Sequence, residues 1–139
     1  MNNEQYSKEK RLPKIAADII IECEGKVILI KRKFPPYGWA LPGGFLEYGE
    51  TVEQTARREA KEETCLDLVD VKQFHTYSAP SRDLRWHTIS VIFTAKGVGM
   101  PQAADDASEL KLYTLDNLPE PICFDHKKVL EDYKKSVKE

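Results

Sequence analysis

Three glutamates, Glu59, Glu62 and Glu63, stand at positions that a helix would bring onto one face. Residues three and four positions apart are neighbours on the surface of an α-helix. Three carboxylates gathered there repel one another, so the arrangement costs stability unless a cation lies among them. Clustered carboxylate oxygens are the ligands that Mg²⁺ and Mn²⁺ prefer. The spacing therefore predicts a site for a divalent metal ion, Mg²⁺ first and Mn²⁺ as the alternative.

The residues before the glutamates predict a loop that leads into a helix. Segment 41–50 contains one proline and three glycines, which disfavour regular structure. Thr51 and Gln54 form a T-x-x-Q pattern, which is typical of a capping box at the start of a helix. We expect the helix to begin at about Thr51 and to end at about Thr64, with the glutamates on its second half.

This loop and helix resemble the signature of the Nudix (MutT-type) hydrolases. The positions that match the signature are Gly44, Glu50, Arg58, Glu59, Ala60, Glu62, Glu63 and Leu66. One position departs from it, because Cys65 stands where the signature has a glycine. A solvated acidic helix face is the ordinary alternative for a run of charges. That alternative does not account for the loop glycines or for Arg58.

The resemblance implies a chemistry for the cluster. Members of the family hydrolyse a nucleoside diphosphate that is linked to another group. The diphosphate and the glutamates are both anionic, so cations must lie between them, and metal ions there also polarise the phosphorus and activate a water. By the resemblance, the metal ligands are Gly44, through its backbone carbonyl, and the side chains of Glu59, Glu62 and Glu63.

Arg58 is expected to support the carboxylates rather than to react. It lies four residues before Glu62 and can pair with it or with Glu50. On a helical wheel, Glu63 falls within roughly 80° of Val52 and Ala60, which belong to the apolar stripe. We therefore expect Glu63 to be the deepest of the ligands and to be partly desolvated.

The general base is expected to come from a later loop, as it often does in this family. The candidates are Asp105, Asp106 and Glu109, and Glu109 ranks first because it directly precedes a predicted strand. Glu62 or Glu63 as the base stays open. The residues expected to take part in catalysis are Arg58, Glu62, Glu63 and Glu109.

Cys65 is expected to lie at the end of the helix in a left-handed conformation. Cysteine in place of glycine there costs about 1 kcal/mol or less. Because no base is close to it in the sequence, we expect the thiol to be a structural residue and not a nucleophile.

Substrate choice is predicted from segment 77–87 and from the residues before the glycine loop. Pro80 lies fourteen residues past Leu66, and this spacing resembles that of the ADP-ribose pyrophosphatases within the family. Two further segments, Ser78–His87 and Phe124–His126, also resemble that group.

Several residues of these segments are candidates for contact with the substrate. The candidates for the phosphates are Arg32, Arg82 and Arg85, and those for the adenine are Tyr37, Tyr77 and Trp86. A structural alternative stays open for the arginines, in which Asp83 caps a turn and pairs with one of them, and for Arg32, which could be a solvated hairpin end. His87 is expected to begin a strand and to bond to the backbone.

The leading function is Mg²⁺-dependent cleavage of ADP-ribose to AMP and ribose 5-phosphate. The first alternative is a MutT-like pyrophosphatase that acts on an oxidised nucleoside triphosphate such as 8-oxo-dGTP. The second is a sensor that binds a nucleotide sugar without cleaving it, although this chain keeps all the signature acids. Relatives often form homodimers, and we expect one here.

Composition limits the remaining possibilities. The chain has 139 residues and a net charge of −2, which suits one domain and does not indicate binding to nucleic acid. Its three cysteines are widely spaced, which suits reduced thiols in the cytoplasm. The longest apolar run, Ala16–Ile21, is broken by Asp18 and is too short to span a membrane.

The pattern of hydrophobic residues predicts an α+β fold. A flexible segment 1–13 is expected before a single domain at 14–139. The predicted strands lie at 15–22, 26–31, 39–41, 68–78, 88–95 and 110–114, with a hairpin at Glu24–Gly25. A second helix is predicted at 125–135. The resemblance implies that these elements form the Nudix-type α/β/α sandwich with a mixed β-sheet.

Overall fold

Strand β1 (Lys14–Cys23) is the centre of a mixed sheet in the computed structural model, which describes residues 11–138. It runs parallel to β6 (Thr88–Val98) and antiparallel to β2 (Lys26–Arg32) and β4 (Gly43–Phe45). The other strands are β3 (Trp39–Ala40), β5 (Asp67–Tyr77) and β7 (Ala107–Tyr113), and the helices are α2 (Val52–Thr64), the short 3-10 helix η1 (Pro80–Arg82) and α3 (His126–Val137).

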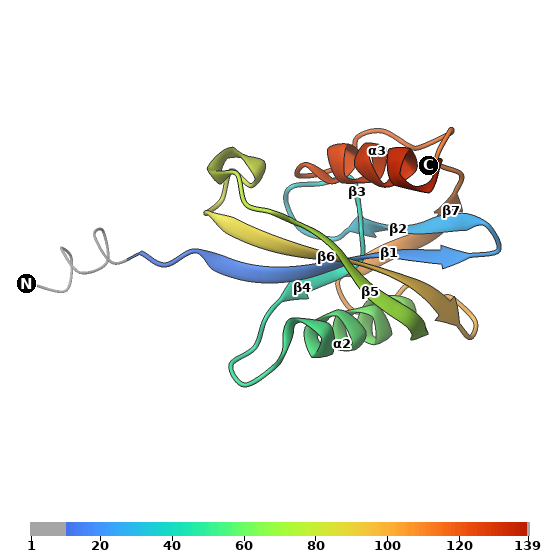
Figure 1. Cartoon of the computed structure of the whole chain (residues 1–139), viewed down its shortest axis with the longest axis horizontal. Coiled ribbons are helices and arrows are strands. Elements are labelled where there is room, and N and C mark those ends of the chain that lie inside the picture. The colour runs from blue at the N-terminus through green and yellow to red at the C-terminus, as the bar shows by residue number, and fades with distance from the viewer. Residues whose placement is uncertain (1–10, 139) are drawn as a thin grey trace, which may run out of the picture.

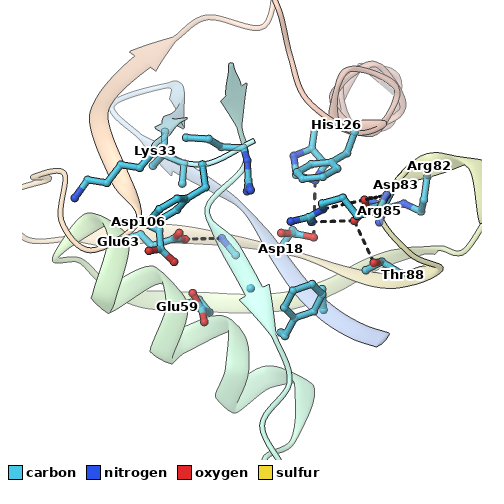
Figure 2. Close-up of a pocket in the computed structure, with 18 residues that line it drawn as sticks. Asp18, Lys33, Glu59, Glu63, Arg82, Asp83, Arg85, Thr88, Asp106 and His126 are labelled. Atoms are coloured by element: carbon cyan, nitrogen blue, oxygen red, sulfur yellow. Dashed lines mark hydrogen bonds and ion pairs between the residues drawn. The ribbon is translucent and has the colours of Figure 1, made fainter. Parts of the chain in front are cut away.

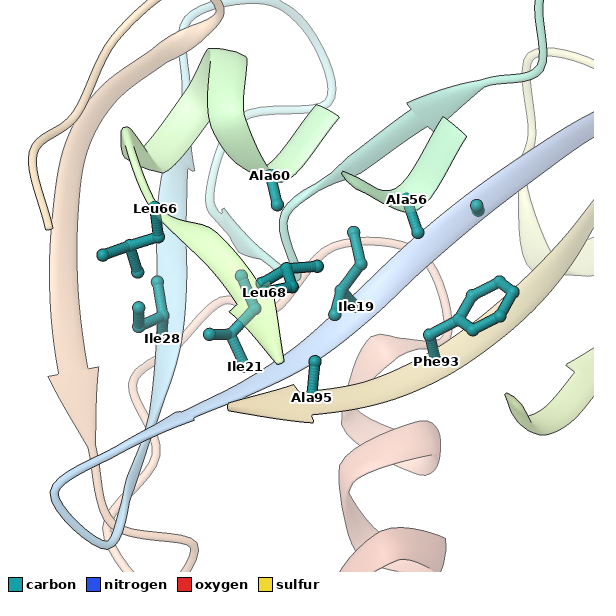
Figure 3. Packing of buried hydrophobic residues seen from close by; sticks show 10 residues of the cluster. Ile19, Ile21, Ile28, Ala56, Ala60, Leu66, Leu68, Phe93 and Ala95 are labelled. Atoms are coloured by element: carbon teal, nitrogen blue, oxygen red, sulfur yellow. The ribbon is translucent and has the colours of Figure 1, made fainter. Parts of the chain in front are cut away.

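The two long helices cover opposite faces of the sheet (Figure 1). The core under α2 contains Ile19, Ile21, Ala56, Ala60, Leu66 and Phe93 (Figure 3). The core under α3 contains Ile20, Leu29, Trp39, Ile92, Val129 and Leu130. Both faces of β1 are therefore buried, which explains its unbroken run of isoleucines. The predicted α+β sandwich with a mixed sheet is confirmed.

The predicted turns and caps follow the residues that specify them. Glu24 and Gly25 have φ of 53° and 76°, the positive values that a tight hairpin between β1 and β2 requires. At the start of α2, Thr51 accepts a bond from the backbone of Gln54 and Gln54 accepts one from the backbone of Thr51. The helix ends at Cys65, whose φ of 64° is the left-handed conformation expected there.

Several boundaries differ from the prediction, and two of the differences bear on the site. The glycine loop contains the short strand β4, which pairs with β1 through Gly43 opposite Asp18. A β-carbon on Gly43 would lie 2.7 Å from the Cα of Asp18, so only glycine allows this approach. The second difference is that β7 begins at Ala107 and not at Leu110.

The expected N-terminal segment lies mostly outside the described residues. Residues 11–13 precede β1 without regular structure. Within 11–138, no helix has the length and apolar character needed to cross a membrane.

Candidate active site

Helix α2 presents two of its glutamates to a cavity of about 290 Å³. Glu59 and Glu63 line it from the helix, and Asp106 reaches it from the loop before β7 (Figure 2). Glu63 is only 4% exposed, as its position on the apolar edge of the helix predicts. Glu62 points outward, with 42% of its side chain exposed, and is not part of the cavity wall.

Arg58 connects the glutamates to the glycine loop. Its guanidinium donates two bonds to Glu50, at 2.7 and 3.0 Å, and one to Glu59 at 2.7 Å. It also reaches Glu62 at 3.4 Å and donates to the backbone carbonyl of Phe45 at 3.0 Å. The bonds from Arg58 lower the pKa of Glu50 to about 2. Both predicted partners of Arg58 are therefore present, and the arginine orients the carboxylates around it.

The glycines of β4 allow the loop to lie against the carboxylates. The backbone N–H of Gly43 donates to Glu63 Oε1 at 2.8 Å. A β-carbon on Gly44 would lie 2.6 Å from Glu59 Oε2, so any other residue would displace that carboxylate. The predicted role of the Gly44 carbonyl as a metal ligand stays a prediction.

Burial and mutual repulsion disfavour the ionised forms of the carboxylates at this site. Burial raises the pKa of Glu63 to about 9, and the charges of Glu59, Asp18 and Asp106 add to this, against the hydrogen bond from Gly43. Burial also raises the pKa of Glu59, although Arg58 opposes the shift. A cation among these groups would stabilise their ionised forms.

The carboxylates at the cavity are the kind of ligand that a divalent metal ion prefers. From the described residues no hydrogen-bond donor reaches the second oxygens, Glu59 Oε2 and Glu63 Oε2, which leaves one oxygen of each for a ligand. Yet no three acidic, histidine or cysteine side chains within 11–138 already surround a single point. Arg58 holds one oxygen each of Glu59 and Glu62.

The loop before β7 brings Asp106, and not Glu109, to the cavity. The loop is attached to the end of α2, where Gln102 donates to the carbonyl of Thr64 at 2.9 Å and Ala104 to that of Glu63 at 3.1 Å. Asp106 follows this attachment and lines the cavity.

Glu109 lies within β7 because the strand starts earlier than predicted. Successive side chains of a strand face opposite sides. Leu110 and Leu112 pack against the core under α2, so Glu109 is exposed on the other face, away from the glutamates of α2. The structure therefore does not support the ranking of Glu109 as first candidate for the base.

The cavity has basic and aromatic residues on its other side. Arg85 faces it and is held by Asp83, with bonds at 3.1 and 2.9 Å (Figure 2). Arg32 follows a bulge in β2, and its Nε donates to the carbonyl of Pro36 at 2.9 Å. Phe124 lies 5.1 Å from the guanidinium carbon of each arginine, measured to its ring centroid.

Other predicted substrate contacts are paired within the protein or lie away from the cavity. Arg82 is buried and donates two bonds to Asp125, at 2.9 and 2.6 Å, so its charge is already paired. Tyr77 is buried and donates to Asp132 at 2.7 Å, which excludes it as a stacking surface for a base. Tyr37 is 67% exposed and does not line the cavity.

Trp86 and His87, in the segment before β6, contact other parts of the protein. Trp86 packs under Lys14, at 3.9 Å from the ammonium nitrogen to a ring centroid, and does not line the cavity. His87 bonds to the backbone carbonyl of Ser78 at 2.8 Å, as expected for the start of a strand.

A buried polar group behind the glycine loop was missed by sequence reasoning. His126 Nδ1 accepts a bond from Leu41 N–H at 3.0 Å, so its Nε2 carries the proton and faces Asp18 at 3.8 Å. Ser90 donates to the same carboxylate. Burial lowers the pKa of His126, which keeps the ring neutral. Two signals in the sequence pointed to it: Asp18, a single acid inside an apolar run, and His126 in the segment Phe124–His126.

A mixed sheet between two helices, with a glycine loop and a glutamate helix at one cavity, is the arrangement of a known family. Residues 12–133 match the model of the NUDIX domain, and the chain belongs to the Nudix family of hydrolases. Enzymes of this family generally need a divalent metal ion.

The chain is also similar to individual members of the family. The chain is 47% identical over 124 residues to an ADP-ribose pyrophosphatase of Methanocaldococcus jannaschii, covering 87% of this chain and 73% of the relative. The NUDIX domain of Shewanella oneidensis NrtR, solved in complex with ADP ribose, has a TM-score of 0.82 and 27% identity, with 99% of both chains covered. A MutT NUDIX hydrolase of Burkholderia pseudomallei has a TM-score of 0.80 and 27% identity, covering 87% of this chain and 98% of its own.

Proposed function

We propose that this protein is a Mg²⁺-dependent pyrophosphohydrolase that cleaves ADP-ribose to AMP and ribose 5-phosphate. One observation carries the proposal: a single cavity has the carboxylates of Glu59 and Glu63 on one side and the guanidinium groups of Arg32 and Arg85 on the other. A diphosphate needs cations on both sides, supplied by metal ions at the carboxylates and by the arginines opposite. The M. jannaschii relative and the ADP ribose complex of the S. oneidensis domain support the choice of substrate.

Each residue of the site receives a role in this proposal. Glu59, Glu62 and Glu63 would hold Mg²⁺ together with the carbonyl of Gly44, and Mn²⁺ has the same ligand preference. When bound, the metal supplies charge neutralisation, polarisation of the phosphate and an activated water. Arg58 keeps the carboxylates in place through its bonds to Glu50, Glu59 and Glu62.

We propose Asp106 as the general base in place of Glu109. A base must come within hydrogen-bond reach of the water from which it takes a proton. Asp106 lines the cavity of Glu59 and Glu63, whereas Glu109 faces the opposite side of the sheet.

Product analysis tests the proposed activity. With Mg²⁺ and ADP-ribose, the purified protein is expected to release AMP and ribose 5-phosphate, and a chelator is expected to stop the reaction. Release of pyrophosphate from 8-oxo-dGTP, with ADP-ribose left intact, would show that the MutT-like alternative is correct. Tight binding of ADP-ribose without turnover would favour the sensor instead.

The variant Glu63→Gln tests the ligand assignment. The amide keeps the size of the side chain but loses the negative charge, so we expect turnover to fall by at least about 10²-fold while the fold stays intact. Circular dichroism and a thermal melt check the fold. Glu53→Gln is the control, because Glu53 lies on the exposed face of α2 and, among residues 11–138, pairs only with Arg57. A near-normal rate for Glu63→Gln would refute the assignment.

The proposal also includes the oligomeric state and the cellular location of the protein. A homodimer is expected from relatives, and light scattering after gel filtration would show a mass twice that of the chain. Cys23, Cys65 and Cys123 are free thiols, which suits the reducing environment of the cytoplasm.

A further inference from the structure

His126 is a buried polar side chain at the start of α3, and the proposed reaction gives it no role. Only 2% of the residue is exposed. Both of its ring nitrogens face a partner within the protein. Nδ1 accepts the backbone N–H of Leu41 at 3.0 Å, and Nε2 lies 3.8 Å from Oδ2 of Asp18 (Figure 2). A buried ring with a partner at each nitrogen is held in one orientation and holds its partners in turn.

Asp18 and Ser90 set the tautomer of this ring. Ser90 donates its hydroxyl to the same carboxylate oxygen that faces the histidine, so the carboxylate is itself fixed. A ring N–H directed at a carboxylate is favoured over a ring lone pair, which places the proton of the neutral imidazole on Nε2. Nδ1 is therefore left as a hydrogen-bond acceptor, which is the role that the N–H of Leu41 requires.

The chain from Leu41 onward leads directly to the carboxylates of α2. Leu41 donates to α3, and the carbonyl of Pro42 accepts a bond from β1 at 2.8 Å. Gly43 donates to Glu63 of α2 at 2.8 Å, and Gly44, the proposed carbonyl ligand of the metal, comes next. Three consecutive residues are thus bonded to three different elements, which fixes the backbone before Gly44.

The bond from Leu41 is the one that α3 contributes. Leu41 is 2% exposed, so water could not replace the acceptor if His126 were removed. An unpaired buried N–H is costly, and the backbone would move to find another partner. Only Pro42, whose φ is fixed by its ring, separates Leu41 from Gly43, so a movement at Leu41 is passed on to β4.

We propose that His126 is a positioning residue for the metal site. Through Leu41 it holds the start of β4 at the distance from α2 that the Gly43–Glu63 bond and a metal contact at Gly44 require. Its effect on the reaction passes through the backbone and not through contact with the substrate. This inference rests on the proposed function, because the metal ion belongs to that proposal, but the bonds of segment 41–43 can be measured without metal.

Two substitutions separate the two nitrogens of the ring. The side-chain oxygen in His126→Asn takes the place of Nδ1 and can accept from Leu41. The side-chain nitrogen in His126→Gln takes the place of Nε2, so that variant keeps a donor toward Asp18 and loses the acceptor. Asparagine is smaller than glutamine and leaves the larger void, so a role in packing alone predicts more damage from His126→Asn. The proposal predicts the reverse order.

Amide hydrogen exchange, followed by NMR without metal or substrate, measures the bonds of the loop. We expect the N–H groups of Leu41 and Gly43 to exchange about tenfold faster or more in His126→Gln. In His126→Asn we expect both rates to stay within about twofold of those in the unmodified protein.

Titration with Mn²⁺, followed by electron paramagnetic resonance without substrate, measures the consequence for the metal. We expect the Kd to rise about 10- to 100-fold in His126→Gln and less than about threefold in His126→Asn, since a residue that orients a ligand has effects of this size. His75→Gln is the matched control, because His75 is exposed on β5 and does not line the cavity, and it is expected to change neither measurement.

The outcomes separate this inference from the proposed function. Faster exchange and weaker Mn²⁺ binding in His126→Gln, with His126→Asn close to the unmodified protein, support it. Equal losses in both variants, a larger loss in His126→Asn, or unchanged exchange or Mn²⁺ binding in His126→Gln overturns it. An unmodified protein that binds no Mn²⁺ or leaves ADP-ribose intact refutes the proposed function, and the exchange rate at Gly43 then still decides whether His126 holds β4 in place.

Discussion

At the scale of single residues, the three glutamates of α2 differ in their surroundings. Glu63 is buried and bonded to the backbone of Gly43, Glu59 is bonded to Arg58, and Glu62 is largely exposed. The three glutamates share one helix face, but they are therefore not equivalent as candidate metal ligands. We expect Glu63 to be the most sensitive to substitution and Glu62 the least.

The choice between Asp106 and Glu109 is a prediction about two individual side chains. Asp106→Asn is expected to lower kcat by about 10²-fold or more, because a base at the cavity loses its ability to accept a proton. Glu109→Gln is expected to change kcat less than twofold, and it is the matched control. Steady-state rates with ADP-ribose measure both, and the reverse order would restore Glu109 as the base.

Cys65 offers a test of backbone strain at one position. Its φ of 64° suits glycine, which the family signature has at this place. Cys65→Gly is expected to raise the free energy of unfolding by up to about 1 kcal/mol, with no change in activity. Urea denaturation measures it. Cys65→Ala keeps the strain and removes the thiol, so a similar gain in that variant would show that strain is not the cause.

At the scale of elements, β4 and α2 act as a pair. Gly43 pairs with Asp18 of β1 and at the same time donates to Glu63 of α2, so the strand fixes the distance between sheet and helix. Arg58 adds a second connection from α2 to β4 through the carbonyl of Phe45. The glutamates are positioned by these contacts as much as by their own helix.

Gly44→Ala tests this pairing. The new methyl group would displace the Glu59 carboxylate, which lies at the flexible end of a side chain, and not the backbone. We therefore expect a folded protein whose turnover is lowered at least tenfold, measured with ADP-ribose and a thermal melt.

Gly97→Ala provides the contrast to Gly44→Ala. A β-carbon there would lie 2.8 Å from the sulfur of Cys23 and 2.9 Å from Leu66, inside the core. That variant is expected to lose about 1–3 kcal/mol of stability but to keep its activity while folded. Equal effects of both variants on turnover would refute a local role for Gly44.

At the scale of the whole molecule, the start of α3 holds together parts that are distant in sequence. His126 accepts the backbone N–H of Leu41, next to the glycine loop. Asp125 accepts both bonds from Arg82, which ends η1. The cavity walls on the side of α3 therefore depend on this helix being in place.

Arg82 is predicted to stabilise the molecule and not to bind the phosphates. Its side chain is 3% exposed and that of Asp125 is 19% exposed, so Arg82→Met would leave a partly buried carboxylate without its partner. We expect the free energy of unfolding to fall by about 3 kcal/mol, measured by urea denaturation. The double variant Arg82→Met/Asp125→Leu is expected to recover part of this loss. A raised KM without loss of stability would instead restore Arg82 as a substrate contact.

The sequence by itself determined the elements and the chemistry proposed for the glutamates of α2. The capping box at Thr51 and Gln54, the hairpin at Glu24–Gly25 and the apolar runs are local signals, because each depends on residues a few positions apart. The spacing of the glutamates and Arg58 belongs to one helix, so the burial of Glu63 and the pairing of Arg58 with Glu62 could be predicted from helix geometry alone.

Only the tertiary structure decided which side chains from other elements reach the cavity. Because β7 begins at Ala107 and not at the predicted Leu110, Asp106 is the last residue of the loop and lines the cavity. Glu109 lies inside the strand, where successive side chains face opposite sides, and it faces away from the cavity. The pairing of Arg82 with Asp125 and the contact of Phe124 with Arg85 at the cavity join segments about forty residues apart. Such contacts depend on how the sheet and α3 pack, and a pattern read along one segment holds no information about that packing.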